Sequence, residues 1–242
     1  MRKALTTITL ILLVAYVIFA TIALTGKPDS EVCKELHLEI QDSLEMSYIT
    51  TCDVIELLAQ DGINPIGRQL HEVNLHEMEK SLEKSPLIRN CECYKSINGH
   101  VMVKVECRRP ILHVVTISGD NFYLDEEGEV IESISKAVYV PVATGHITRK
   151  FAQQNLLALA QHIDSNELWK KQIEQIHVTP HGTIELTPRI GNHVIVLGRP
   201  ENYEQKLDNL KIFYKKGLNE VGWERYSCIN LDYENQVIAS KK

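Results

Sequence analysis

The chain has 242 residues, of which 44% are hydrophobic, and it carries 26 Lys and Arg against 32 Asp and Glu, a formal net charge of -6. This length is enough for one large or two small domains, and the hydrophobic fraction is ordinary for a globular protein. The acidic balance argues against nucleic acid as a main partner, because phosphate binding requires a basic surface.

The N-terminal segment differs in composition from the rest of the chain. Residues 5–24 carry no charge and are mainly Leu, Ile, Val, Ala and Thr. About 20 such residues in a helix cover roughly 30 Å, the thickness of a bilayer core. Arg2 and Lys3 precede the segment, and positive charges in so short a flank usually stay in the cytoplasm. The pattern predicts a cytoplasmic tail at residues 1–4 and a single transmembrane helix at residues 5–25, with later residues outside the cytoplasm.

A cleaved signal peptide is the alternative interpretation of this segment. Thr21-Ile22-Ala23 is a weak match to a small-x-small cleavage site. Signal peptides, however, have a shorter apolar region of about 7–15 residues. The length of the segment therefore favours a membrane anchor.

The next part of the chain has the pattern of a small α+β module. Residues 35–40 alternate between polar and apolar side chains and predict a first strand. Thr50 and Asn74 each stand three residues before an acidic residue, as helix N-caps often do, and they predict two helices. Two strands follow at residues 87–95 and 101–107. The predicted order is strand, helix, helix, strand, strand.

The two later strands of this module form a hairpin around Asn98-Gly99. A two-residue turn there would place Cys91 and Cys93 on the face opposite Val103. Burial favours one shared face, so we expect a longer loop with an odd number of residues. Cys107 then shares that face as well. The three cysteines are small buried hydrophobes, or a disulfide between Cys107 and a neighbour, or a metal site.

The remainder of the chain predicts a mostly antiparallel β domain with two helices. Strands are expected at residues 122–131 (a hairpin around an acidic turn), 138–142, 173–179, 183–189 and 193–197. Thr148 caps the first expected helix, and the second covers residues 203–218. The second helix leads into a last strand.

That C-terminal strand alternates, with Ile229, Leu231 and Tyr233 facing one way and polar residues facing the other. A strand that closes a chain is often a sheet edge, where unpaired backbone groups can pair with another chain. Trp223 and Tyr226 precede it and are candidates for interface anchors or for packing between the last helix and the strand. We therefore expect a docking edge here.

No residue pattern indicates catalysis. His177-x-x-x-His181 spans a predicted strand and turn, where the two side chains need not converge on a metal, and His71 and His76 flank a helix start. Asp125-Glu126-Glu127 lies in a tight turn, where adjacent acids are usually solvated. Neither a phosphate-binding glycine loop nor a Gly-x-Ser-x-Gly motif occurs. We expect no enzyme, no cofactor and no metal.

Five stretches together resemble the FtsQ/DivIB family of cell-division proteins, in the version found in the Bacteroidota group. They are residues 85–93 (Ser-Pro-Leu-Ile-Arg-Asn-Cys-Glu-Cys), 108–111 (Arg-Arg-Pro-Ile), 122–128 (Phe-Tyr-Leu-Asp-Glu-Glu-Gly), 191–198 (Gly-Asn-His-Val-Ile-Val-Leu-Gly) and 206–233. The order strand, helix, helix, strand, strand also resembles a POTRA domain. The resemblance implies a POTRA domain at residues 26–110 and an FtsQ-type β domain at residues 111–242.

The resemblance also implies a role. Such proteins are essential-type scaffolds of the divisome that link early and late division proteins and control septal peptidoglycan synthesis. The implied partners are an FtsB/FtsL-like coiled-coil pair, which adds to the C-terminal β strand, together with FtsK and FtsW/FtsI-like proteins. The implied location is the inner membrane at the division septum, with the C-terminal domains in the periplasm.

The resemblance carries over to particular residues. The family's Leu-x-Tyr matches Leu231-Asp232-Tyr233, and its contact positions after that tyrosine match Asn235 and Gln236. The expected partner-binding residues are Ile229, Leu231, Tyr233, Asn235, Gln236, Trp223 and Tyr226. A second partner patch on the POTRA domain is expected at Asn90, Cys93 and Lys95.

A second function remains open at this point. The chain is then a membrane-anchored, POTRA-containing chaperone or secretion accessory that handles unfolded clients. Specificity separates the two functions, because a scaffold binds one defined partner and an accessory binds many extended peptides weakly. Substitutions at Tyr233 or Gln236 are the direct test of the scaffold.

Overall fold

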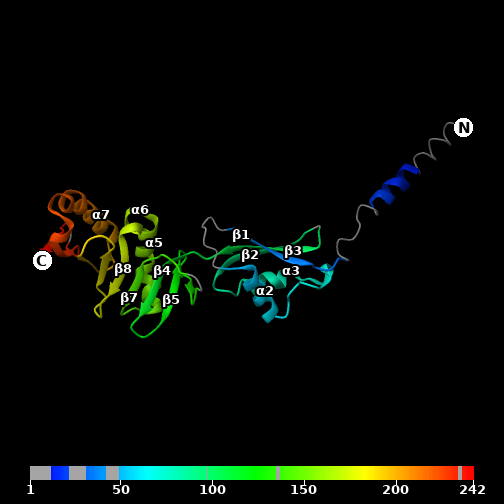
Figure 1. Ribbon diagram of the computed structural model, residues 1–242, viewed down its shortest axis with the longest axis horizontal. Helices are drawn as coiled ribbons and strands as arrows, with labels where there is room; N and C mark the ends of the chain where they lie inside the picture. Colours follow the sequence, from blue (N-terminus) through cyan, green and yellow to red (C-terminus); the bar gives the residue numbers. More distant parts are fainter. Residues whose placement is uncertain (1–11, 22–30, 42–48, 97, 135–136, 234–235) are drawn as a thin grey trace. The chain divides into compact units, whose positions relative to one another are not determined.

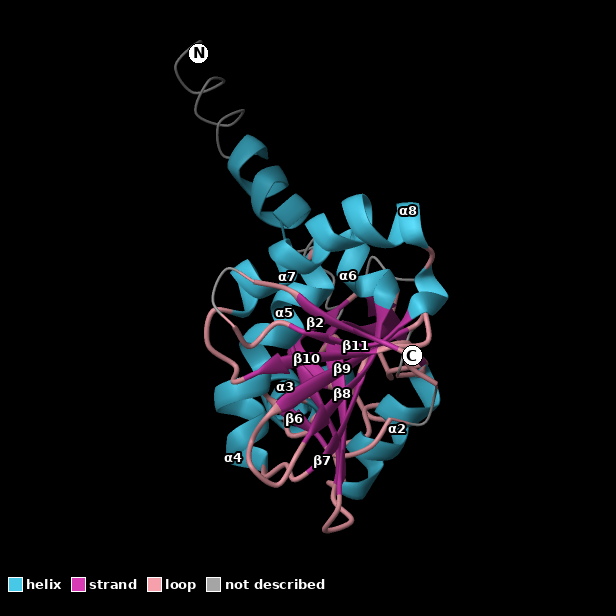
Figure 2. Cartoon of the chain, turned by 90° about the vertical axis from the view of Figure 1, so that its left-hand side faces the viewer, coloured by secondary structure: helices cyan, strands magenta, loops and turns pink. Residues whose placement is uncertain are grey.

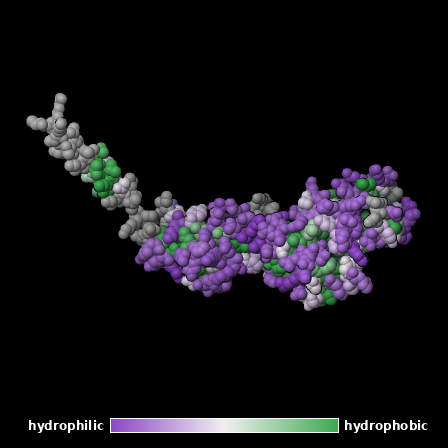
Figure 3. All heavy atoms as spheres, turned by 180° about the vertical axis from the view of Figure 1, so that it is seen from behind, coloured by the Kyte–Doolittle hydropathy of each residue, from purple (hydrophilic) through white to green (hydrophobic). Residues whose placement is uncertain are grey.

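The computed structural model describes residues 12–21, 31–41, 49–96, 98–134, 137–233 and 236–242. The chain divides into two compact units, Met1–Glu106 and Cys107–Lys242 (Figure 1). Residues 12–21 are helical, and their exposed apolar side chains form a hydrophobic segment (Figure 3). The rest of the expected transmembrane segment lies outside the described residues. Among the helices that are described, none has both the length and the apolar character to cross a membrane.

The first unit is a three-stranded sheet with two helices. Its elements are β1 (Glu35–Ile40), α2 (Thr51–Gln60), the 3-10 helix η2 (Leu70–Glu72), α3 (Leu75–Leu82), β2 (Ile88–Lys95) and β3 (His100–Cys107). The strand order is β1-β3-β2, and β1 runs parallel to β3. Val54 and Leu58 of α2 and Met78 and Leu82 of α3 are buried in its core. The predicted order of elements is confirmed.

Both predicted helix caps are present in the first unit. The Thr50 hydroxyl accepts a hydrogen bond from the Asp53 N–H at 3.3 Å, and the Thr50 N–H donates to the Asp53 carboxylate at 2.7 Å. The Asn74 side chain accepts from the Glu77 N–H at 3.3 Å. These bonds satisfy N–H groups that have no partner within the helix, and so they fix where α2 and α3 begin.

The β2–β3 hairpin has the odd-numbered loop that the burial argument requires. The Ser96 N–H donates to the His100 carbonyl at 2.8 Å, so these two residues lie opposite each other with an odd number of residues between them. Gly99 has a φ of +80°, a conformation that glycine adopts without strain. Cys91, Cys93 and Cys107 are therefore buried on the same face as Val103.

Four of the six cysteines are buried thiols, namely Cys33, Cys91, Cys93 and Cys107, whereas Cys228 is half-buried and Cys52 is exposed. All six lie in described parts of the chain and are free. The Sγ atoms of Cys91 and Cys93 are 4.0 Å apart, and the contact with Cys91 together with burial raises the pKa of the Cys93 thiol. The three hairpin cysteines thus have the role of small buried hydrophobes in this structure.

The second unit is a nine-stranded mixed sheet in the order β12-β11-β10-β9-β8-β7-β4-β5-β6. The strands are β4 (Pro110–Thr116), β5 (Asn121–Asp125), β6 (Val130–Ile131), β7 (Val142–Gly145), β8 (Ile173–Val178), β9 (Ile184–Pro188), β10 (Val194–Gly198), β11 (Tyr226–Asn230) and β12 (Ile238–Lys241). Pairing is parallel at β4–β7, β7–β8 and β10–β11 and antiparallel at the other contacts. The sheet is therefore mostly antiparallel, as predicted, with three parallel contacts that alternation alone does not indicate.

The helices of this unit pack against the sheet (Figure 2). They are α4 (Arg149–Phe151), the π-helical turn η3 (Ala152–Leu156), α5 (Leu157–Ser165), α6 (Glu167–Gln172), α7 (Tyr203–Phe213), the π-helical turn η4 (Tyr214–Leu218), α8 (Asn219–Val221) and the 3-10 helix η5 (Trp223–Arg225). Leu159 and Leu210 from the helices share one core with Ile176, Leu186 and Ile195 from the strands. The two predicted helical segments are thus present.

Several details of the predicted second unit are wrong. The seven-residue strand β4, which lies inside the sheet between β7 and β5, has no counterpart among the predicted strands. The short helix α6 was not expected; Asn166 begins it by accepting hydrogen bonds from the N–H groups of Leu168 and Trp169, and Trp169 is fully buried. The strand expected at residues 138–142 instead begins at Val142. Proline explains that shift, because Pro141 has no N–H to donate to a sheet and here only accepts, from the His113 N–H.

Candidate functional site

The edge of the large sheet at its C-terminal side is β12. The strand expected to be the edge, β11, pairs with β10 on one side and with β12 on the other. Ile229 lies opposite Ala239, and Asn230 lies opposite Ile238. The prediction that the alternating strand with Ile229 and Leu231 forms the edge is therefore wrong, because the four residues of β12 cover that side of β11.

The outer side of β12 is open for pairing. No other described strand pairs with it, and the opposite edge of the sheet is the two-residue strand β6. An edge strand presents unpaired backbone N–H and C=O groups that can template another strand. Ile238 is 43% exposed at the start of β12, and Lys241 is exposed at its end.

Two of the expected partner-binding side chains belong to the core. Ile229 and Leu231 are buried, with exposures of 0% and 1%, and they pack in the same cluster as Leu210. Their side chains do not reach the surface, so they stabilise β11 and cannot contact a partner directly. Period-two alternation identified their strand correctly, but it does not say which face a partner would meet.

Trp223 and Tyr226 are half-buried packing residues. Trp223 lies 4.8 Å from the Tyr214 ring centroid, and its Nε1 donates to the Asn219 side chain at 3.3 Å. Tyr226 stacks edge-on against Phe213, with ring centroids 5.8 Å apart. Both aromatic residues therefore pack the last helical segment against β11, the alternative that the sequence left open.

Of the expected partner-binding residues, Tyr233 and Gln236 face solvent. Tyr233 is 56% exposed and Gln236 is exposed, and the Gln236 N–H donates to the Tyr233 carbonyl at 3.4 Å. Both lie between β11 and β12. Asn235, also expected to contact the partner, lies outside the described residues.

Residues 231 and 232, which precede Tyr233, are held in place by contacts with residues 196–198 and with Lys206. The Leu231 N–H donates to the Val196 carbonyl at 2.8 Å, beyond the last residue of β11. Gly198 ends β10 with a φ of +80°, and a side chain there would overlap the Asp232 carboxylate. Lys206 Nζ lies 3.6 Å from that carboxylate and donates to the Leu197 carbonyl at 2.9 Å. These contacts hold the segment that leads to Tyr233.

A groove lies next to the edge. It has a volume of about 390 Å³ and is lined by Asn209, Ile212, Phe213, Lys216, Gly217 and Val237. Ile212 is 53% exposed within it, and Val237 directly precedes β12. The face of this unit that Figure 3 shows is mostly hydrophilic, and exposed apolar patches often mark interaction sites.

A buried polar pair lies in the second unit, between His193 and Tyr214. His193 Nε2 and the Tyr214 hydroxyl are 3.0 Å apart, and both residues are at most 5% exposed. Burial raises the pKa of Tyr214 and lowers the pKa of His193. Both groups are therefore held neutral, and they link the residue 191–198 stretch to the last helical segment.

The acidic turn Asp125-Glu126-Glu127, considered above as a candidate catalytic site, is part of an ion-pair network. Arg108 Nη1 lies 2.9 Å from Asp125, whose carboxylate also accepts the Glu127 and Glu129 N–H groups. Arg109 lies 2.9 Å from Glu126. Asp125 is only 1% exposed, so the expectation of solvated acids is wrong for it. The side chains of two sequence stretches, residues 108–111 and 122–128, thus meet.

Asp164 joins this network from α5. Its carboxylate lies 2.8 Å from Arg109 and 2.9 Å from Lys170. Burial alone would raise the pKa of Asp164, but the hydrogen bonds from Arg109 and Lys170 outweigh burial and hold the pKa below its usual value. The Asp164 hydrogen bond likewise raises the pKa of Arg109. These charges stay ionised and hold α5 to the β4–β5 hairpin.

The expected POTRA patch does not form one surface. Asn90 is exposed, whereas Cys93 is only 8% exposed and its N–H donates to the Glu79 carboxylate at 2.8 Å. Lys95 is half-buried and has the same strand parity as Cys93. Successive strand residues alternate between faces, so Asn90 lies on the face opposite Cys93. Cys93 as a partner contact is therefore corrected to a core residue.

The histidines singled out in the sequence have local partners. His177 Nδ1 lies 3.1 Å from the Thr144 hydroxyl, and His76 Nδ1 lies 3.7 Å from Glu79. His71 Nε2 lies 4.0 Å from Glu72. Within the described part of the chain, none of these histidines, nor His181, belongs to a group of three metal-ligating side chains.

Comparison with protein families agrees with this architecture. A family model described as FtsQ/DivIB, C-terminal related, matches residues 109–240, more than half of the chain. The chain belongs to the FtsQ/DivIB family. Its first unit corresponds to a second model, a POTRA-like domain, which matches residues 31–106. None of the curated proteins matches the chain.

Membership defines the coarse role of the chain. FtsQ/DivIB proteins are membrane proteins of the division site, and both matched families are non-catalytic scaffold domains. The chain is a division-associated scaffold. The FtsQ/DivIB match extends from the residue before β4 into β12, so it includes most of the edge strand and, apart from Arg108, the ion-pair network.

Proposed function

We propose that this FtsQ/DivIB protein is a divisome scaffold that docks an FtsB/FtsL-like coiled-coil pair by strand addition to β12. Docking there couples early and late division proteins and controls septal peptidoglycan synthesis. The observation that carries the proposal is the open edge of β12 beside an apolar groove. Strand addition draws affinity from main-chain hydrogen bonds and specificity from neighbouring side-chain pockets.

The groove suits a helix that precedes or follows the added strand. Ile212 and Phe213 offer apolar contacts, and the Tyr233 ring stands exposed near the start of β12. An apolar helix face and a strand of the partner would then be held side by side. This arrangement fits a coiled-coil protein that ends in a short extended segment.

Charge favours an acidic partner at this edge. Lys216 lines the groove, and Lys215 next to it is exposed. Lys241 is exposed at the end of β12. Positive groups around an edge speed the encounter with an acidic segment and disfavour basic competitors.

The proposed location follows from the N-terminal segment. Arg2 and Lys3 precede a long apolar run, and the described part of that run is an exposed apolar helix. We place residues 1–4 in the cytoplasm, residues 5–25 in the inner membrane, and the POTRA domain and the β domain in the periplasm at the septum. We further propose FtsK and FtsW/FtsI-like proteins as partners. Of the three residues expected to form the partner patch on the POTRA domain, only Asn90 is exposed.

Pull-down of the FtsB/FtsL-like pair with variants of the full-length protein tests the docking site. Tyr233→Ala and Ile212→Asp each remove a side-chain contact, and we expect each to weaken binding by about tenfold or more, the loss typical of an interface hot spot. Tyr139→Ala and Ile117→Asp are matched controls, because these side chains are 89% and 66% exposed at other places in the unit. Controls that bind like the wild type would localise the effect.

Removing residues 238–242 tests strand addition itself. We expect this truncation to abolish binding, because the partner strand loses its template. Unchanged binding of the truncated chain would show that the edge is not the docking site. Equal, weak binding of many unrelated extended peptides would indicate the secretion accessory instead.

A further inference from the structure

A group of metal-ligating side chains lies in the first unit, away from the docking edge. We infer that Glu35, His37 and His100 form a binding site for a divalent transition-metal ion of the zinc type. The site is independent of the proposed docking function. It uses residues to which the sequence assigns no role.

Strand pairing brings the three residues together. In the parallel pair β1–β3, Glu35 lies opposite His100. His37 is two residues further along β1, so it projects from the same face as Glu35. Leu36 and Val101, on the alternate positions, are buried in the core. The three ligating side chains therefore share the outer face of the sheet.

The distances suit a small cation. His37 Nε2 lies 3.3 Å from Glu35 Oε2, and one ligating atom from each of the three residues lies within 4.8 Å of the others. The imidazole rings of His37 and His100 meet edge to face, with centroids 4.9 Å apart and an interplanar angle of 82°. Zinc bonds of about 2.0–2.2 Å place ligand atoms roughly 3.5 Å apart, so small side-chain rotations complete the geometry.

The donor set points to a transition metal. Two imidazoles and one carboxylate are typical ligands of zinc sites that keep a fourth position for water or another ligand. His100 Nδ1 is buried and has no hydrogen-bond partner in the described part of the chain. A buried polar atom without a partner is costly, and an ion bound through this nitrogen would offset that cost.

The charge around the group also favours a cation. Glu35 contributes one carboxylate, and its side chain is 65% exposed. Glu31 contributes a second at the same end of the sheet, since its Oε2 lies 2.8 Å from the position of a Cβ at Gly99, next to His100. Glu31 stands outside the ligand group but makes the local potential more negative. Bound metal would fasten the edge strand β1 to the central strand β3.

Metal titration of the full-length protein in detergent, with a non-thiol reductant, tests the site. We expect calorimetry to show one zinc ion bound per chain and thermal unfolding to shift to higher temperature when zinc is added. The double variant His37→Gln/His100→Gln should bind zinc more than about tenfold more weakly, since even changes outside the ligand shell often cost that much. The zinc-dependent shift should disappear with it.

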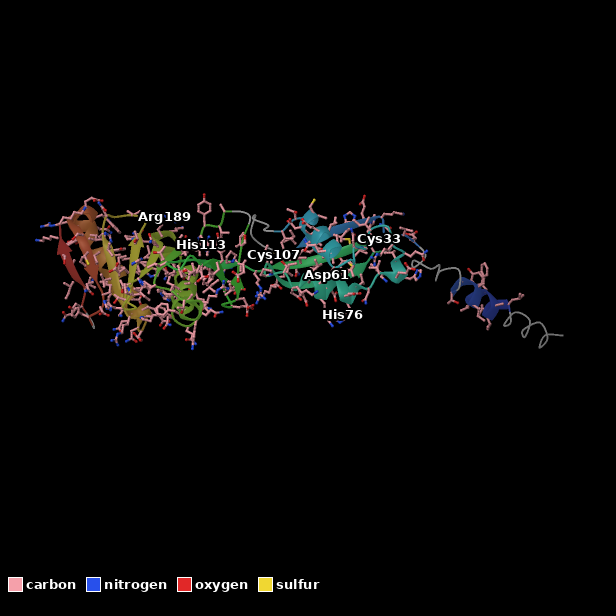
Figure 4. All side chains as sticks on the ribbon, turned by 90° about the horizontal axis from the view of Figure 1, so that it is seen from below. Cys33, Asp61, His76, Cys107, His113 and Arg189 are labelled. Carbon is pink, nitrogen blue, oxygen red and sulfur yellow. The ribbon has the colours of Figure 1, made fainter. Side chains whose placement is uncertain are left out.

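A matched double variant separates this site from general binding to histidine. His71→Gln/His76→Gln also removes two imidazoles that lie near carboxylates in the same unit, and His76 is exposed on α3 (Figure 4). We expect that variant to bind zinc like the wild type. Equal binding by both double variants would overturn the proposal, as would no zinc binding by the wild type.

Cobalt spectroscopy excludes the cysteines as the source of binding. Cobalt held by nitrogen and oxygen ligands lacks the near-ultraviolet charge-transfer absorption of a thiolate complex, and we expect that absorption to be absent. A strong thiolate band would assign the metal to cysteine and contradict the site. If the double variant fails to fold, Glu35→Gln can replace it, because this substitution changes only an exposed carboxylate. We expect Glu35→Gln to weaken zinc binding in the same calorimetric titration.

Discussion

At the scale of single residues, the contact between the Gly198 backbone and the Asp232 side chain helps to position the segment that precedes the proposed docking edge. Gly198 ends β10 where the Asp232 carboxylate lies against it, and Lys206 Nζ is close to the same carboxylate. Asp232 directly precedes the exposed Tyr233. The orientation of Tyr233 therefore depends on a glycine that is distant in sequence.

Gly198→Ala should destabilise the second unit more than Gly182→Ala does. Both glycines have similar positive φ values, +80° and +78°, so each alanine has a similar backbone cost of about 1–2 kcal/mol. Only Gly198 also meets a neighbour, which adds about 1–3 kcal/mol from overpacking. Urea unfolding of the full-length protein measures the difference. Equal losses in the two variants would show that Asp232 moves aside without cost.

At the scale of secondary-structure elements, much of the fold is readable from the sequence because burial imposes a period. Alternation located β1, β8, β9, β10 and β11, and capping residues located α2 and α3. The odd-length β2–β3 loop followed from requiring Cys91 and Cys93 to share a face with Val103. These features depend on residues close together in the chain.

Most features that the sequence does not predict depend on short segments or on distant ones. β4 is the exception: it has seven residues, but they are buried almost continuously and lack the alternation of a half-buried strand. The four-residue strand β12 is too short for alternation to indicate it, and so the sequence predicts β11 as the edge. α6 has six residues and begins at a single capping asparagine, Asn166. The parallel contact that brings His37 next to His100 has no local signal at all. Of the expected docking residues, sequence pattern located the strand but could not separate buried Ile229 from exposed Tyr233.

Asp125→Ala should disrupt the β4–β5 hairpin. The carboxylate is buried, pairs with Arg108 and accepts two backbone N–H groups. Its loss leaves those N–H groups without their acceptor and leaves Arg108 with the more exposed Glu127 carboxylate at 3.3 Å. Breaking a buried pair in this way typically costs about 3–5 kcal/mol. Denaturant unfolding checks the loss.

Glu132→Ala is the control for this variant. Its carboxylate pairs with Arg149 at 2.6 Å, but the Glu132 side chain is 58% exposed. Solvent screens such pairs, so the stability of this variant should stay close to that of the wild type. A similar loss in both variants would mean that burial does not distinguish the two ion pairs.

At the scale of the whole molecule, the proposed function requires a particular membrane topology. The family match assigns a scaffold of the division site to the chain, and both sheets follow the apolar N-terminal segment in the sequence. A docking edge on the second unit can meet periplasmic coiled coils only if the C-terminus lies outside the cytoplasm. Topology and function are therefore tested together.

An alkaline phosphatase fusion at the C-terminus should be active, because that enzyme needs the oxidising periplasm to form its disulfides. Arg2→Glu/Lys3→Glu should lower the activity, since positive charge sets the orientation of a short flank. An inactive fusion would contradict the topology.

Depletion of the protein, followed by microscopy, should give filamentous cells without septa. Normal septation after depletion would contradict the division role.

The shortness of β12 has a consequence for how tightly a partner can bind. Only four residues fasten this strand to β11, and such short terminal elements open locally at a small fraction of the global unfolding free energy. A partner that adds to β12 binds only the molecules in which β12 is paired, so its apparent affinity falls by the fraction that is open. Changes that strengthen the β11–β12 pair would then raise affinity without touching the partner. The apparent affinity of the scaffold for its partner would thus depend on the stability of the β11–β12 pair.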